Sequence, residues 1–242
     1  MATLAIDTAT EVLAIALGDG RKVLAQSSID AGRSHLELLL PGVERLLDSA
    51  GLAIRDVESI VAGTGPGTFS GLRVGISTAR ALAQALEVRL SGFSTLEALA
   101  LEMSLDVPAA ALILPVIDAK RGQVFTQLYK KEGDDKLKSE SGVLCLDPVR
   151  LLEWLKKMTG ERVRAAGNGA MAYRDILKPE KQLDPLAQDH PGNRVNAVWH
   201  LRGAEAAGAF DPGRLLSVVP VYVREPDADK TILLRKREPW LR

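Results

Sequence analysis

Cysteine and long apolar runs are scarce in this chain of 242 residues. The single cysteine, Cys145, excludes an internal disulfide framework and a cysteine-based zinc site. The longest apolar run, residues 107–117, contains two prolines and is far shorter than the roughly 20 residues that a membrane-spanning helix needs. The N-terminal segment carries Asp7 and Glu11 without a basic lead-in, so we expect no secretory signal there and a cytoplasmic protein.

An excess of either charge is also absent. Lys and Arg together number 31, Asp and Glu together number 31, and the net charge is therefore zero. A basic field over the whole protein, as nucleic-acid binding favours, is excluded. A local basic segment does occur near the C-terminus, which could contact RNA backbone or be a solvated tail; its basic residues are Lys230, Arg235, Lys236, Arg237 and Arg242.

The order of strand and helix patterns occurs twice along the chain. Apolar segments 3–7, 12–17 and 22–28 are joined by short turns and predict an antiparallel meander. Near Asp106 the pattern starts again, with strands expected at 112–118, 123–129 and 141–146 and an exposed loop at 130–138. In both halves, helices and a further strand follow, which predicts a duplicated α/β protein.

We expect four segments in this organisation. Residues 1–105 form an N-terminal lobe, which a returning helix over residues 193–210 joins. Residues 106–192 form a C-terminal lobe, and residues 211–242 form an extended segment and tail.

A glycine-rich loop, residues 63–71, lies between a predicted strand and a predicted helix. The free N–H groups of the first helical turn point towards such a loop and could hold a phosphate or a carboxylate. Alternatively, the glycines only let backbone segments approach closely. On the first reading, the phosphate-facing candidates are Asp7, Thr8, Gly65 and Gly67.

The helix after this loop carries a stripe of small residues at every fourth position: Gly71, Gly75, Ala79 and Ala83. Such a stripe lets another helix approach more closely than the usual ~8–10 Å between axes. The partner helix could be internal or could come from another chain. The leucine-rich helix expected over residues 35–47, which Ser34 and Glu37 begin as a capping box, would complete a two-helix contact surface.

Side chains for metal or nucleophilic chemistry do not form a recognisable pattern. The three histidines, His35, His190 and His200, have no i,i+4 spacing, and we interpret them as surface or capping residues. Cys145 lies in an apolar strand and is interpreted as a buried small hydrophobe. No Ser or Cys lies in a nucleophile-elbow motif.

Six stretches of the sequence, in order, resemble the TsaB family, also called YeaZ. They cover nearly the whole chain; the stretches are Ala5-Ile6-Asp7-Thr8-Ala9-Thr10, residues 63–75, Ser94-Thr95-Leu96-Glu97-Ala98-Leu99, residues 114–122, Gly167-Asn168-Gly169-Ala170 and Pro220-Val221-Tyr222-Val223-Arg224. The resemblance implies a two-lobe actin/hexokinase-like (ASKHA) fold, with duplicated mixed sheets that begin as antiparallel strands. It also implies a role in forming N6-threonylcarbamoyladenosine (t6A) at adenosine 37 of tRNAs that read codons beginning with A.

In that family the catalytic relative is TsaD, and TsaB is its non-catalytic partner beside the ATPase TsaE. The resemblance therefore implies a scaffold that binds TsaD, self-associates when alone, and meets tRNA only through the complex, with no membrane partner. The expected contact surface comprises His35, Leu36, Leu39, Leu40, Val43, Gly71, Leu72, Gly75, Ile76, Ala79 and Ala83.

Three departures from enzymatic relatives argue against independent catalysis. Ser94 and Ala98 stand where TsaD carries a histidine pair for a metal, and neither can replace imidazole. Ala9 stands where nucleotide-binding members of the fold have glycine, and its Cβ would crowd a phosphate. The sequence of the second lobe has no Gly-Gly-containing adenosine loop, and the nearest candidate is Gly167-Asn168-Gly169.

We accordingly expect no cofactor and no metal in the chain alone. Binding of ATP or ADP at an interface shared with the partner stays an open alternative. An ASKHA-type small-molecule kinase, or another phosphate-binding enzyme, is the alternative that Asp7 and the glycine loop favour. The third hypothesis is a metallopeptidase, which is a label that the wider family has carried. The missing histidine pair argues against this hypothesis.

Overall fold

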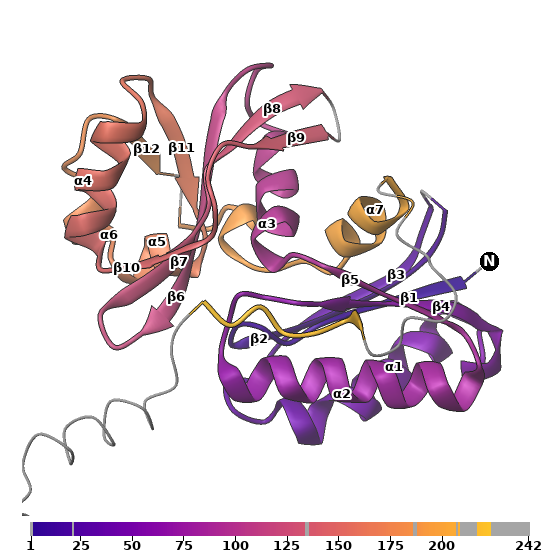
Figure 1. Ribbon diagram of the computed structural model, residues 1–242. Coiled ribbons are helices and arrows are strands. Elements are labelled where there is room, and N and C mark those ends of the chain that lie inside the picture. Colours follow the sequence, from indigo (N-terminus) through magenta and orange to yellow (C-terminus); the bar gives the residue numbers. More distant parts are fainter. Residues whose placement is uncertain are drawn as a thin grey trace, which may run out of the picture.

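The computed structural model describes residues 2–20, 22–133, 136–185, 188–206, 208 and 217–223. Figure 1 shows two lobes, each built on its own β-sheet, with helices on the faces of the sheets. In the described part, no helix is both long enough and apolar enough to cross a membrane.

The first sheet has the strand order β3-β2-β1-β4-β5. Its strands are β1 (Ala2–Asp7), β2 (Val12–Asp19), β3 (Lys22–Asp30), β4 (Val57–Gly63) and β5 (Arg89–Phe93). The first three pair antiparallel, as the meander pattern predicts, whereas β4 pairs parallel with both β1 and β5. The carboxyl ends of β1 and β4 therefore meet at one edge, which brings Asp7 close to the glycine loop.

Helices cover both faces of this sheet (Figure 1). On one face lie α1 (His35–Ala50) and α2 (Phe69–Leu86), and on the other lies α7 (Val198–Ala206) beside α3 (Thr95–Ser104). A short 3₁₀ helix (Ile54–Asp56) precedes β4. Because α1 and α2 both follow strands that run in the same direction, both helices begin at the same end of the sheet.

Side-chain size differs between the two faces of the central strands. Large residues pack towards α1 and α2, and small ones face α7; the buried large ones include Leu4, Ile6, Leu13, Ile15 and Leu17, and the small ones Ala5, Ala14 and Ala16. Small residues on a sheet face allow a helix to come close. The period-2 alternation thus specifies which face each helix covers.

The second lobe contains a seven-stranded sheet with the main order β10-β7-β6-β11-β12. Its strands are β6 (Leu112–Lys120), β7 (Gln123–Thr126), β8 (Tyr129–Gly133), β9 (Lys136–Ser139), β10 (Leu144–Leu146), β11 (Val163–Ala166) and β12 (Leu183–Pro185). The helices are α4 (Pro148–Met158), α5 (Asn168–Ala172) and α6 (Arg174–Leu177), and a 3₁₀ turn (Pro191–Asn193) precedes α7.

Three expectations for this lobe were wrong. The segment 123–129 is not one strand, because β7 ends at Thr126 and β8 begins at Tyr129. Residues 130–138, expected as a loop, lie largely in the antiparallel β8–β9 hairpin, whose sequence is rich in charged residues and shows no apolar alternation. Cys145 is only half-buried in β10, because this short strand pairs on one side only.

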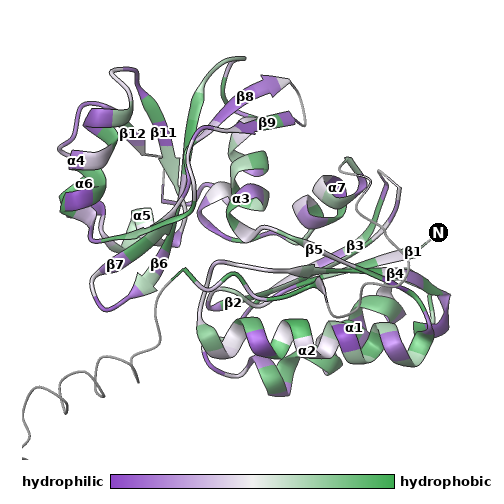
Figure 2. Cartoon of the chain, viewed as in Figure 1, coloured by the Kyte–Doolittle hydropathy of each residue, from purple (hydrophilic) through white to green (hydrophobic). Residues whose placement is uncertain are grey.

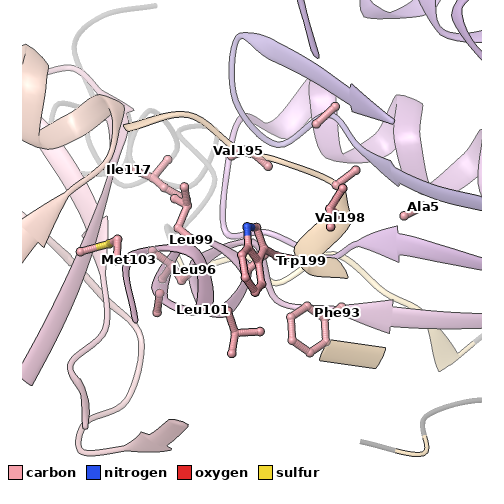
Figure 3. Close-up of a cluster of buried hydrophobic side chains, with 14 of the residues drawn as sticks. Ala5, Phe93, Leu96, Leu99, Leu101, Met103, Ile117, Val195, Val198 and Trp199 are labelled. Atoms are coloured by element: carbon pink, nitrogen blue, oxygen red, sulfur yellow. The ribbon is translucent and has the colours of Figure 1, made fainter. Parts of the chain in front are cut away.

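An apolar cluster joins the two lobes (Figure 3). It brings together side chains from α3, β6 and α7, including Leu99, Ile117 and Trp199. Every residue of α3 except Glu97 is buried, so this helix is packed on nearly all sides. In Figure 2, α1 and α2 carry both hydrophobic and hydrophilic residues along their length. The shared cluster makes the two lobes one packed unit.

Candidate functional site

Asp7, the first candidate for contacting phosphate, lies fully buried at the end of β1. Its Oδ1 accepts a hydrogen bond from the Ala9 N–H at 2.7 Å. Its Oδ2 accepts one from the Thr95 hydroxyl at 2.6 Å and lies 2.7 Å from Nε2 of His200. Both carboxylate oxygens are therefore occupied by the chain itself, which corrects the expectation that Asp7 faces a ligand.

The Asp7 carboxylate and the His200 imidazole contact each other in a site without exposure to solvent. His200 is fully buried on α7, and its Nε2 approaches Asp7 outside hydrogen-bond geometry while its Nδ1 has no hydrogen-bond partner. Burial acts to raise the pKa of Asp7, but the His200 charge and the hydrogen bonds from Thr95 and Ala9 outweigh it and hold the pKa below its usual value. Asp7 therefore remains a carboxylate at neutral pH.

Thr8, the second candidate, packs into the stripe of small residues on α2. Its hydroxyl donates a hydrogen bond to the Gly71 carbonyl at 2.7 Å. A Cβ at Gly71 would overlap the Thr8 carbonyl oxygen, and a Cβ at Gly75 would overlap the Thr8 hydroxyl. The glycines are needed because the loop after β1 lies directly against α2.

This packing corrects the predicted contact surface. The small residues of α2 face the chain's own core, so they cannot also touch another molecule. Of the eleven residues predicted for the surface, nine are buried, namely His35, Leu39, Val43, Gly71, Leu72, Gly75, Ile76, Ala79 and Ala83. Only Leu36 and Leu40 are exposed. Spacing identified the stripe correctly but did not show which way it faces.

The glycine loop packs closely against the first loop. The Thr68 N–H donates to the Ala9 carbonyl at 2.8 Å, and a Cβ at Gly67 would overlap that carbonyl. Gly65, buried with φ +89°, donates its N–H to the Thr95 hydroxyl and accepts from the Thr95 N–H. The N–H groups of Ala9, Gly65 and Thr68 thus have internal partners. The structure favours the close-packing interpretation of the loop over the phosphate-facing one.

The expected adenosine loop is also packed internally. A Cβ at Gly167 would overlap the Val116 carbonyl oxygen of β6. The Asn168 side chain accepts a hydrogen bond from the Asp118 N–H at 3.0 Å. These contacts fix the loop against β6.

A charge contact that sequence patterns did not reveal connects the lobes near the surface. Nζ of Lys120, the last residue of β6, lies 2.6 Å from Glu11 of the first lobe and 2.9 Å from Asp118. The hydrogen bond to Glu11 is the main cause of a raised pKa for Lys120. Because the Lys120 and Glu11 side chains are largely exposed, such a pair stabilises the fold by at most about 1 kcal/mol.

The histidines do not gather into a metal site. His35 is buried in α1, His200 pairs with Asp7, and Nε2 of His190 lies 2.6 Å from Asp106. In the described segments, no three His, Cys, Asp or Glu side chains lie close enough to hold a metal ion together. Ser94 caps α3 by accepting from the Glu97 N–H at 3.3 Å, and Ala98 is buried.

Apolar side chains are exposed at the ends where α1 and α2 begin. Leu36 is 74% exposed and Leu40 54%, while Phe69 is 54% exposed and Tyr222 50%. The ring centroids of Phe69 and Tyr222 lie 5.3 Å apart, and the Arg73 guanidinium lies 3.8 Å from the Phe69 centroid. We call Leu36, Leu40, Phe69 and Tyr222 the apolar face.

Tyr222 reaches this position because residues 217–223 lie along the first lobe. The Val221 N–H donates to the Thr64 carbonyl at 2.9 Å, Val218 is buried, and the Arg80 guanidinium donates to the Val218 carbonyl. Sequence patterns missed both aromatic residues. The signal was Phe69, a large apolar side chain directly after the helix cap Thr68.

The chain is thus a two-lobe protein of the actin/hexokinase-like (ASKHA) class. In this chain, the two loops at which we expected a phosphate make hydrogen bonds to each other and to Thr95 instead. The fold resembles that of the activator of 2-hydroxyisocaproyl-CoA dehydratase from Clostridium difficile, with a TM-score of 0.50 and 14% identity over 86% of this chain and 97% of that one. At this level of identity the likeness concerns the fold alone.

Closer relatives identify the family. The family described as TsaD, tRNA N6-adenosine threonylcarbamoyltransferase, matches residues 26–185. The tRNA threonylcarbamoyladenosine biosynthesis protein TsaB from Bacillus subtilis is 34% identical over 95% of this chain and 96% of its own length. The structure of YeaZ from Pseudomonas aeruginosa has a TM-score of 0.72 and 28% identity, covering 91% of this chain and 99% of that one. The chain belongs to the TsaB (YeaZ) family.

Proposed function

We propose that this protein is a non-catalytic subunit that binds and activates TsaD in the formation of t6A at position 37 of tRNAs that read ANN codons. The name of the B. subtilis relative, a threonylcarbamoyladenosine biosynthesis protein, supports a role in this tRNA modification. The match to the TsaD family supports a common origin with the catalytic subunit.

The closure of the loops around Asp7 carries this proposal. A phosphate site in a loop before a helix needs backbone N–H groups without internal partners. Here the N–H groups of Ala9, Gly65 and Thr68 are used within the chain. The arrangement supports a role exerted through the surface of the protein.

The apolar face provides the surface through which TsaD would bind. It combines two leucines of α1 with two aromatic rings in tilted contact, and Arg73 lies against one of the rings. Aromatic and arginine side chains contribute most of the binding energy in many protein interfaces. When TsaD is absent, the same face would pair two copies of this chain, and TsaE would join the complex that contains TsaD.

The experiment compares charge substitutions on two exposed helix surfaces. The double variant Leu36→Glu/Leu40→Glu places charges in the apolar face, and Val149→Glu places one on α4 of the other lobe, where Val149 is 55% exposed. Since all three positions are exposed, each variant should fold. We expect the double variant to bind purified TsaD at least about 100-fold more weakly and to lose t6A formation, with Val149→Glu unchanged.

Normal t6A formation with the double variant would contradict the proposed surface. The kinase alternative makes a different prediction, namely that the isolated chain consumes ATP with a small-molecule substrate. Measured turnover by the isolated chain would therefore contradict the proposed non-catalytic role.

A further inference from the structure

A concave region lies between the lobes, beside the glycine loop. It is a cavity of about 230 Å³, bounded by the glycine loop, the start of α3, the β8–β9 hairpin and residue Val221. Its apolar wall consists of Pro66, Leu137, Val143 and Val221. The polar wall consists of Ser94, Glu97, Gln127, Tyr129 and Ser139. Figure 1 shows α3 beside this hairpin.

Most of the polar groups in the wall are hydrogen-bonded to one another. The Tyr129 hydroxyl donates to Oε1 of Gln127 at 2.8 Å. Nε2 of Gln127 donates to the Ser139 hydroxyl at 2.7 Å and to the Ser141 carbonyl at 2.8 Å. The Ser94 hydroxyl accepts from the Glu97 N–H and donates to the Gly65 carbonyl. These residues form a satisfied network that shapes the cavity.

Glu97 differs from its neighbours in this wall. It is the one residue of α3 that is not buried, so it opens onto the cavity while the rest of the helix is packed. None of the described residues that line the cavity is Lys, Arg or His. Burial raises the pKa of Glu97, and burial together with the Glu97 carboxylate raises the pKa of Tyr129. The cavity therefore holds one acidic group, a hydrogen-bonded polar rim and an apolar wall.

These features select among cationic ligands. A metal ion prefers several acidic or imidazole ligands, and no group of three such side chains is found in the described segments. An organic cation needs only one carboxylate for its charge and can bury its aliphatic body against Pro66, Leu137, Val143 and Val221. We propose that this cavity binds a small organic cation, an alkylammonium or alkylguanidinium group whose charge pairs with Glu97. This site goes beyond the proposed function and does not require TsaD.

The test is a titration of the isotope-labelled full chain by nuclear magnetic resonance. The probe is n-butylammonium, with n-butanol and butyrate as neutral and anionic molecules of similar size. We expect saturable shifts of the amide signals of Glu97 and of β8 with butylammonium, and at least about ten-fold weaker binding of the other two. Equal binding of n-butanol, or no binding of butylammonium, would overturn the proposal.

Two substitutions separate charge from shape. Glu97→Gln keeps the shape and removes the charge, so binding should weaken at least about ten-fold. Leu137→Trp fills the cavity from β9 and keeps the carboxylate, so binding should be lost. The matched control is Glu153→Gln, an exposed glutamate on α4, which should bind as the unaltered chain does. Unchanged binding by both Glu97→Gln and Leu137→Trp would place the probe elsewhere and contradict the site.

Acidification gives an independent readout. Only the ionised Glu97 attracts a cation, so affinity for butylammonium should fall as the pH is lowered through the raised pKa of this carboxyl group. In Glu97→Gln, the remaining affinity should not change over the same range. A pH-independent affinity in the unaltered chain would contradict pairing with Glu97.

Discussion

The Asp7 carboxylate and the His200 imidazole lie 2.7 Å apart in the solvent-free centre of the first lobe, although they come from the first strand and the last described helix. Thr95, on a third element, donates to the same carboxylate oxygen. One acidic side chain thus connects β1, α3 and α7. A group that could have held a ligand instead fixes the packing of three elements.

Removal of the Asp7 charge is expected to destabilise the fold strongly. Asp7→Asn removes a buried carboxylate that accepts from Ala9 and Thr95 and lies against His200, and the loss of one partner of such a buried pair costs about 3 kcal/mol or more in the free energy of unfolding. Chemical denaturation measures this loss. In a double-mutant cycle, the loss of unfolding free energy in Asp7→Asn/His200→Gln should be smaller than the sum of the losses in the two single variants. Strict additivity would show that the two side chains do not interact.

Acid should reduce the contribution of Asp7 to stability. Its pKa is lower in the folded protein than the ordinary value of 3.8, so the unfolded chain binds the proton more readily. The contribution is complete above about pH 5 and is lost as the pH falls towards the lower folded value. The stability difference between the unaltered chain and Asp7→Asn should therefore narrow below about pH 4. Denaturation midpoints from pH 7 to pH 3 measure it, with Asp48→Asn on the exposed side of α1 as control. A difference that stays constant over this range would contradict the assignment.

Local patterns predicted much of the fold, because each pattern depends only on residues that lie close together in the sequence. The meander β1–β3 and the two long helices were predicted from alternation and helical spacing. The actin/hexokinase-like class was also predicted correctly. The expected capping box before α1 was wrong in one respect, since Ser34 makes no side-chain cap hydrogen bond.

Contacts between distant segments were not predictable in the same way. His200 was interpreted as a surface or capping residue, because nothing around it shows that α7 returns to cover β1. The side to which the stripe on α2 faces depends on the position of Thr8. The sequence of the helix carries no information about that position. The charged β8–β9 hairpin resembles a loop in sequence, since its outward side chains lack an apolar alternation.

A methyl group at Gly75 should destabilise the protein through its contact with Thr8. In most helices Gly→Ala stabilises by up to about 1 kcal/mol, but here the added Cβ overlaps the Thr8 hydroxyl, and overpacking costs about 1–3 kcal/mol. Thr8→Ala removes that hydroxyl, so Thr8→Ala/Gly75→Ala should be more stable than the two separate losses predict. Thermal denaturation measures the cycle, and Gly160→Ala, where a Cβ meets no atom within 4 Å, is the control. A stabilising Gly75→Ala would contradict the close packing of this loop on α2.

Truncation of Trp199 should destabilise both lobes together. Trp199 is 4% exposed and belongs to the cluster that α3, β6 and α7 share, so Trp199→Ala removes contacts of both lobes. Loss of a large buried aromatic side chain costs about 3–5 kcal/mol. Hydrogen exchange should become faster in β1 and in β6 by similar factors, because one packed unit opens as a whole. The control is Trp154→Ala, which changes a partly buried side chain on α4 at the edge of the second lobe's own cluster. It should accelerate exchange mainly in the second lobe. Faster exchange of β1 alone in Trp199→Ala would show that the two lobes open independently and that the shared cluster does not couple them.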